Sequence, residues 1–332
     1  MKKFIVFIAL LLVILSFNAY AADKVAQTGC GFLDVAAGAR ACGMGEAFTV
    51  LGQDATALFY NPSCIGEVDA NFELSAGGTQ WIADINYLYL AGVFNAGVWG
   101  NFGFSVIAPD YGEFYGTIVT EGGAGYDKTG VFHPHAFCGG VAYAREFTDK
   151  FTVGGQVKFV SQHLGENEFT VIENNRQDTS YVTRQNEIST LSYDFGLLFY
   201  PGFKSFAFGM SVRNFSPRVC YEQIGFELPL IFALGIGMDV MDFFGEYPDY
   251  SLNVAADMLH PRDWGEQYNV GAEISYKNMI FLRAGYKFNS YAEGLNAGVG
   301  FNVAGVKLDY SYSTYDLEGF DMVNRASVGF SF

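Results

Sequence analysis

The chain has 332 residues, of which 50% are hydrophobic, 17% aromatic and only 16% charged, and its net charge is −16. So acidic a chain is a poor partner for nucleic acid, whose binding depends on clustered Lys and Arg. The aromatic residues and the 40 glycines favour strands and tight turns over helices.

The chain begins with the pattern of a secretory signal peptide. A basic start and an apolar run over 4–15 precede small residues at positions 19 and 21, where cleavage is expected. The run is too short to span a membrane as a helix. A lipoprotein reading that uses Cys30 is weaker, because Gln27 stands where an apolar residue is expected. We predict a signal peptide over 1–21 and export of the mature chain.

Residues 22–67 are predicted to form a compact N-terminal segment. The segment is rich in Gly and Ala, carries few charges and holds an Asn61-Pro62 turn signal. It also contains three of the five cysteines, which show no spacing typical of a metal site and leave at least one thiol unpaired. A pairing of Cys42 with Cys64 is left open, as is the redox state of all five. The cysteines are Cys30, Cys42, Cys64, Cys138 and Cys220.

Residues 68–332 are predicted to form a β-barrel, because apolar and polar residues alternate along them. Val306, Leu308 and Tyr310 fall on one face of a strand, and Lys307 and Asp309 fall on the other. Each run is about as long as a tilted transmembrane strand, ~9–11 residues in the bilayer core. We predict fourteen strands, at about 71–79, 84–95, 97–109, 133–146, 151–163, 190–200, 204–215, 228–240, 249–260, 267–277, 279–288, 293–302, 305–315 and 322–332.

The connections between these strands support an all-β, up-and-down transmembrane barrel. The longest, 110–132, 164–189 and 216–227, follow odd-numbered strands, whereas most links after even-numbered strands are very short, as at Ala96; the link at 241–248 is an exception. A soluble β-sandwich or propeller would share the alternation, but its polar face would not need charges along whole strands. In a barrel the polar face lines the lumen. The expected lumen-facing charges are Glu273, Arg283, Lys287, Lys307, Asp309 and Arg325.

The stretch FLDVAAGARACGMGEAFTVLGQDATALFYNPSCIG at 32–66 resembles the N-terminal motif of the PorV/PorQ family of outer-membrane proteins, itself similar to the FadL transporters. Glu46 departs from the family, which has a second Gly there, and Ser63 replaces Ala. The resemblance implies a fourteen-stranded barrel whose N-terminal segment folds into the lumen as a hatch. Arg40 would then pair with lumen charges, either as a structural ion-pair partner or in a transport role. The hatch motif comprises Arg40, Gly43, Met44, Gly45, Asp54, Asn61 and Pro62.

No motif for catalysis is found, so we expect a non-enzyme without cofactor or metal. His133 and His135 could share one side of a strand, but no third ligand has supporting spacing. The resemblance implies a type IX secretion-related protein in the bacterial outer membrane that handles or anchors secreted proteins carrying C-terminal sorting domains, together with other secretion components. A FadL-like transporter for hydrophobic small molecules is the alternative.

Docking of cargo is expected on the long loops, where aromatic side chains either anchor a partner or only cap the barrel rim. The candidate contacts are Tyr111, Phe114, Tyr115, Tyr126 and Tyr181. The terminal Phe332 resembles the signal read by the barrel-assembly machinery. Cargo or ligand identity, an open or closed lumen and the oligomeric state are left open.

Overall fold

The structure is a computed structural model that describes residues 28–119, 125–172, 179–245, 247–290, 292–317 and 320–332. The predicted signal peptide, 1–21, lies outside the described residues. None of the described helices is long and apolar enough to cross a membrane.

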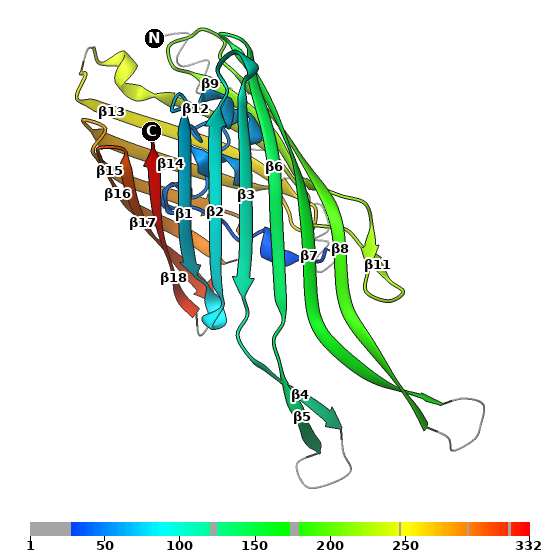
Figure 1. Ribbon diagram of the computed structural model, residues 1–332. Helices are drawn as coiled ribbons and strands as arrows, with labels where there is room; N and C mark the ends of the chain where they lie inside the picture. Colours follow the sequence, from blue (N-terminus) through cyan, green and yellow to red (C-terminus); the bar gives the residue numbers. More distant parts are fainter. Residues whose placement is uncertain (1–27, 120–124, 173–178, 246, 291, 318–319) are drawn as a thin grey trace.

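Fourteen antiparallel strands close into a barrel, as predicted (Figure 1). The first strand pairs with the last, and backbone hydrogen bonds between Phe72 and Phe332 complete the seam. A closed wall leaves no unpaired edge, which is the condition for a sheet in lipid. The strands are β1 (Phe72–Gln80), β2 (Asn86–Asn95), β3 (Asn101–Asp110), β6 (His135–Thr148), β7 (Phe151–Ile172), β8 (Thr179–Phe199), β9 (Ala207–Phe215), β12 (Ile231–Asp239), β13 (Tyr250–Pro261), β14 (Gln267–Tyr276), β15 (Ile280–Phe288), β16 (Glu293–Val303), β17 (Val306–Leu317) and β18 (Phe320–Ser331).

The outer surface of the barrel is apolar and its inner surface is polar. Along β17, Leu308 and Tyr310 are 52% and 46% exposed, whereas Ser311 and Ser313 are fully buried. This is the reverse of a water-soluble sandwich, whose apolar face is covered. The exposed apolar band is that of an outer-membrane barrel facing lipid.

The two ends of the barrel differ. At one end, the short-turn end, strands are joined by tight turns such as Lys277-Asn278, where both residues have φ of 53° as a type I′ hairpin turn requires. Ala96 is not a one-residue link as predicted, because η5 (Gly97–Trp99) forms part of that turn. The exceptional link after β12 holds η6 (Val240–Phe243).

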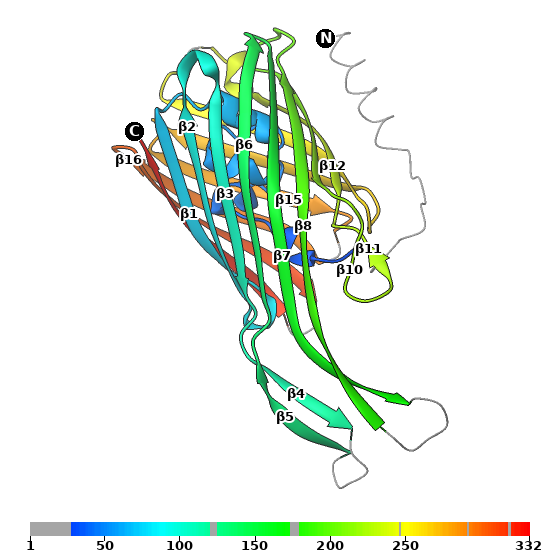
Figure 2. The same ribbon diagram turned by 45° about the vertical axis from the view of Figure 1, so that its right-hand side comes forward.

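The opposite, long-loop end carries strands where loops are expected. In place of a loop over 164–189, β7 and β8 continue past the barrel and stay paired as far as Ile172 and Thr179. The loop over 110–132 contains a hairpin of β4 (Phe114–Val119) and β5 (Tyr126–Phe132). Both hairpins project beyond the barrel (Figures 1 and 2). A smaller hairpin, β10 (Val219–Cys220) with β11 (Gly225–Phe226), and η4 (Ile82–Asp84) lie in other connections.

The N-terminal segment runs through the barrel lumen (Figure 2). It starts at the long-loop end, where Thr28 forms a bridge with Glu227, and reaches β1 at the short-turn end. Its regular elements are short, because small residues and turn formers interrupt them. They are η1 (Gly31–Leu33), α2 (Ala39–Gly43), η2 (Ala55–Phe59) and η3 (Pro62–Glu67).

Candidate functional site: the lumen and the projecting hairpins

The N-terminal segment approaches the barrel wall closely at positions where both the segment and the wall have glycine. A Cβ atom added at Gly43 would lie 3.0 Å from Gly298 Cα, and one added at Gly285 would lie 2.2 Å from the carbonyl carbon of Met44. Gly45 has φ +63°, a conformation that L side chains rarely adopt. The small residues of the hatch motif therefore allow backbone-to-backbone packing inside the barrel.

Arg40 joins the segment to the wall through two carboxylates. Its Nη1 donates to Asp54 Oδ2 at 2.7 Å, while its Nη2 and Nε donate to Glu273 Oε1 and Oε2 at 2.9 and 3.0 Å. Arg283 also donates to Glu273 and to Asp309, each at 2.6 Å. Burial opposes ionisation of Asp54, but Arg40 beside it holds the pKa of Asp54 below its usual value. Two predicted motif residues and three predicted lumen charges thus form one network.

A second network centres on Lys287 of β15. Its Nζ donates to Glu46 of the segment and to Glu293 of β16. Arg325 of β18 donates to Glu293 Oε1 at 3.1 Å and to Ser313 Oγ at 2.8 Å. Glu46, which departs from the PorV/PorQ pattern, is therefore one of the segment's contacts with the wall.

Asn61 and Pro62 begin η3 and attach it to its surroundings. The Asn61 side chain caps the element by accepting from the Ser63 backbone N–H at 3.1 Å, and Pro62 occupies the first helical position. The Asn61 amide donates to the backbone oxygens of Thr49 at 2.8 Å and Leu197 at 3.3 Å. Asn61, which belongs to the turn signal seen in the sequence, thus also contacts the barrel wall.

Several inward-facing carboxylates that tie down the segment were not singled out from the sequence. Asp257 accepts from the backbone N–H groups of Phe48 and Thr49 at 2.9 Å each. Glu73 accepts from Lys307 Nζ at 3.1 Å and from a backbone N–H of η2 at 3.3 Å. Strand parity would place these carboxylates in the lumen, but only the fold shows that they meet backbone donors.

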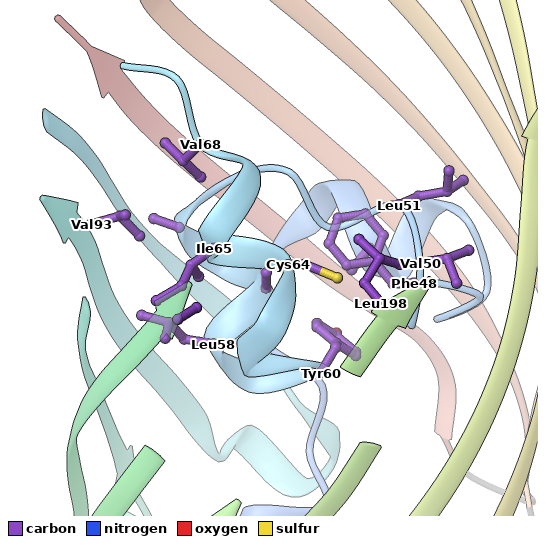
Figure 3. Packing of buried hydrophobic residues seen from close by; sticks show 14 of the residues in the cluster. Phe48, Val50, Leu51, Leu58, Tyr60, Cys64, Ile65, Val68, Val93 and Leu198 are labelled. Carbon is purple, nitrogen blue, oxygen red and sulfur yellow. The ribbon is translucent and has the colours of Figure 1, made fainter. Parts of the chain in front are cut away.

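An apolar core holds residues 41–68 of the segment (Figure 3). Phe48, Leu58 and Ile65 are at most 1% exposed and pack with Leu198 of β8. At ~25 cal/mol per Å² of buried apolar area, each such side chain contributes roughly 1.5–3 kcal/mol. Both apolar packing and ion pairs therefore hold the segment in the lumen.

Cys42 and Cys64 of the segment are free thiols, and so are the other three cysteines of the chain. Cys42 and Cys64 are 1% and 0% exposed. Burial raises the pKa of Cys42 to about 11 and also raises the pKa of Cys64. Both thiols are therefore protonated at neutral pH and shielded from reagents while the segment stays in place.

A cavity lies between the segment and the barrel wall. Arg213 of β9 faces it and donates from Nη1 to the Phe59 carbonyl oxygen at 2.7 Å. The cavity therefore combines apolar side chains with charged groups of both signs, among them Arg213, Lys158 and Asp34. Among its lining residues are Leu33, Phe59, Tyr87, Ile107, Arg213 and Leu259.

The predicted loop aromatics do not lie together. Phe114, Tyr115 and Tyr126 are on the β4–β5 hairpin and are 45%, 61% and 50% exposed. Tyr111 instead packs at the barrel mouth, where Gln162 Nε2 donates to its hydroxyl at 3.4 Å. Tyr181 belongs to β8, but its side chain is outside what the structure describes.

Phe332 ends the chain at the short-turn end. Its side chain is 74% exposed, and its backbone N–H donates to the Phe72 carbonyl oxygen at 3.0 Å. Removing it would break a contact that closes the barrel. Its role as an assembly signal stays a prediction.

The barrel and its luminal segment place the chain among outer-membrane β-barrels of FadL-like architecture. It is similar to the toluene transporter TbuX of Ralstonia pickettii (TM-score 0.62, 13% identity, 89% of this chain and 98% of that chain). It is also similar to the toluene transporter TodX of Pseudomonas putida (0.56, 13%, 89% and 98%) and to a Pseudomonas aeruginosa FadL homologue (0.51, 10%, 94% and 100%). These likenesses show the fold alone.

The family is shown by a match over residues 122–325: the chain belongs to the type IX secretion system membrane proteins PorP/SprF. The PorV/PorQ resemblance rests mainly on residues 32–66, which lie outside the matched range, and it stays a prediction. A search of curated protein sequences finds no match.

Proposed function

We propose that this barrel is a non-catalytic component of type IX secretion that handles or anchors secreted cargo at the cell surface. In this proposal the long-loop end faces outward, and the cargo carries a C-terminal sorting domain. The membership in the PorP/SprF family supports the secretion role. The projecting hairpins are the observation that carries the docking role.

The β4–β5 hairpin is suited to holding an extended segment of cargo. Among the described residues, β4 and β5 pair only with each other, so each has a free backbone edge. Free edges accept an added strand, and neighbouring aromatic side chains supply specificity. The hairpin projects away from the barrel mouth instead of lying across it (Figures 1 and 2), which favours docking over capping of the rim.

Passage of hydrophobic small molecules is the second candidate function. The partly apolar cavity beside Phe59 and Arg213 supports it, as does the likeness to barrels described as toluene transporters. In this alternative the N-terminal segment would act as a gate.

The two functions separate in one experiment. We would delete the gene and restore it either intact or with residues 113–133 replaced by a short Gly-Ser linker. For secretion we expect surface proteins to be lost in the deletion and in the linker variant, with uptake of toluene or fatty acid unchanged. Intact surface proteins together with reduced uptake would overturn the proposal in favour of transport. Heat-modifiable migration would confirm that the linker variant still forms a barrel.

A further inference from the structure

Two histidines from neighbouring strands stack at the long-loop end of the barrel. His135 begins β6 and lies opposite His163 of β7. Their ring centroids are 4.9 Å apart and the ring planes differ by 19°. The sequence alone suggested His133 as the neighbour of His135, because a partner on another strand depends on the register of the ladder.

Carboxylates flank this pair on both sides. The register places Asp110 of β3 opposite His135, and Glu187 of β8 opposite His163. These positions share the outward face of the wall, since the alternate residue Ala136 is buried in the luminal cluster. A row of acid, imidazole, imidazole and acid therefore crosses four adjacent strands.

The ring nitrogens of the pair lack good hydrogen-bond partners. His163 Nδ1 is buried and has none within the described part of the chain. His135 Nδ1 lies 3.5 Å from the His133 carbonyl oxygen, at the limit of a hydrogen bond. A buried polar nitrogen without a partner is unfavourable and calls for an explanation such as a missing ion.

We propose that His135 and His163 bind a divalent transition-metal ion such as Zn²⁺. Neutral imidazole is a preferred ligand of zinc and copper. Zn–N bonds of ~2.0–2.1 Å in tetrahedral geometry place two ligand nitrogens roughly 3.3 Å apart. Because the lone pair of an imidazole nitrogen lies in the ring plane, the two stacked rings must rotate about their side-chain torsions before both nitrogens point to one ion. No group of three His, Cys, Asp or Glu side chains is already arranged around an ion in the described ranges. Asp110, Glu187 or water would complete the coordination once the ion binds.

The bound ion would cross-link β6 and β7 at the base of both hairpins. The β4–β5 hairpin ends at Phe132, shortly before His135. On β7, the register shifts between His163 and Glu166, where the strand leaves the barrel. An ion between the two histidines would therefore fix the direction in which the hairpins project. The site does not depend on the proposed role in secretion.

Zinc titration of the full chain tests the site. We would purify the protein without a histidine tag in detergent, strip it with EDTA and titrate it with Zn²⁺ by calorimetry. We expect one ion per chain, with affinity at least tenfold weaker in H135A and in H163A. H133A and H260A are matched controls that should bind as wild type does; His260 is an exposed histidine 3.4 Å from a carboxylate of Glu266. Heat-modifiable migration checks that each variant is folded.

A spectroscopic readout on the unaltered chain avoids variants that fail to fold. Bound Cu²⁺ should show electron paramagnetic resonance couplings to at least two nitrogens. The proposal is overturned by one or no coupled nitrogen, by zinc affinity that H133A weakens as much as H135A, or by saturable binding of inorganic phosphate in place of zinc.

Discussion

Replacing Arg40 with Met should release the N-terminal segment from the lumen while leaving the barrel closed. Arg40 is 21% exposed and makes three hydrogen bonds to two carboxylates that are 8% and 2% exposed. Met retains much of the side-chain volume but leaves Asp54 and Glu273 without this partner. The segment, and not the wall, should lose stability, because the strands keep their backbone pairing.

The expected free-energy cost of R40M depends on which hydrogen-bond partners Asp54 and Glu273 keep. Breaking a buried ion pair costs about 3–5 kcal/mol when a charge is left uncompensated. Glu273 keeps Arg283 at 2.6 Å, and Asp54 keeps the Thr56 backbone N–H at 2.8 Å. We therefore expect the lower end, about 3 kcal/mol, which is roughly a hundredfold shift in the opening equilibrium.

Thiol labelling measures this opening directly. Cys42 and Cys64 are buried only while the segment is seated, so their reaction with a maleimide should accelerate about a hundredfold in R40M if reclosing outpaces labelling. Mass spectrometry separates them from the exposed Cys220. R145M is the matched control, since Arg145 is exposed and no ion pair joins it to any described residue. Wild-type labelling rates in R40M would refute the reasoning.

Three further changes test other contacts. N61A removes the cap of η3 and the two hydrogen bonds that the Asn61 amide donates. It should destabilise the seated segment by about 1–2 kcal/mol and speed labelling of Cys64 by roughly tenfold; an unchanged rate would count against the cap. G285A places a methyl group against the Met44 backbone, so it should displace the segment and speed thiol labelling. In G294A the added methyl group would have its nearest neighbour 3.7 Å away, so labelling should not change. Equal labelling rates in the two variants would contradict close packing. Deleting Phe332 should impair assembly, seen as loss of heat-modifiable migration, more than Y115A does on the β4–β5 hairpin; normal migration of the deletion variant would refute an assembly role.

Much of the barrel could be predicted because strand parity alone decides whether a side chain faces lipid or lumen. Glu273 and Arg283 illustrate this, since each lies between outward apolar neighbours in its own strand. Their pairing follows from the β14–β15 register. The extensions of β7 and β8 were missed because they continue beyond the length that a bilayer requires.

The contacts of the N-terminal segment could not be predicted in the same way. Several luminal carboxylates could have paired with Arg40, and which of them does so depends on how the barrel closes around the segment. Asp257 looks like any inward polar residue until its two backbone donors are placed. The His135–His163 stack likewise depends on which residues face each other across the ladder.

Site-specific photocrosslinking in living cells tests the cargo role most directly. A photoreactive residue at Tyr115 on the β4–β5 hairpin should crosslink to secreted proteins that carry C-terminal sorting domains. The same residue at Phe203, an exposed position at the short-turn end, should not. If neither position captures secreted protein from cells in which the barrel is assembled and secretion is active, the hairpin is not where cargo docks and the proposed function is wrong.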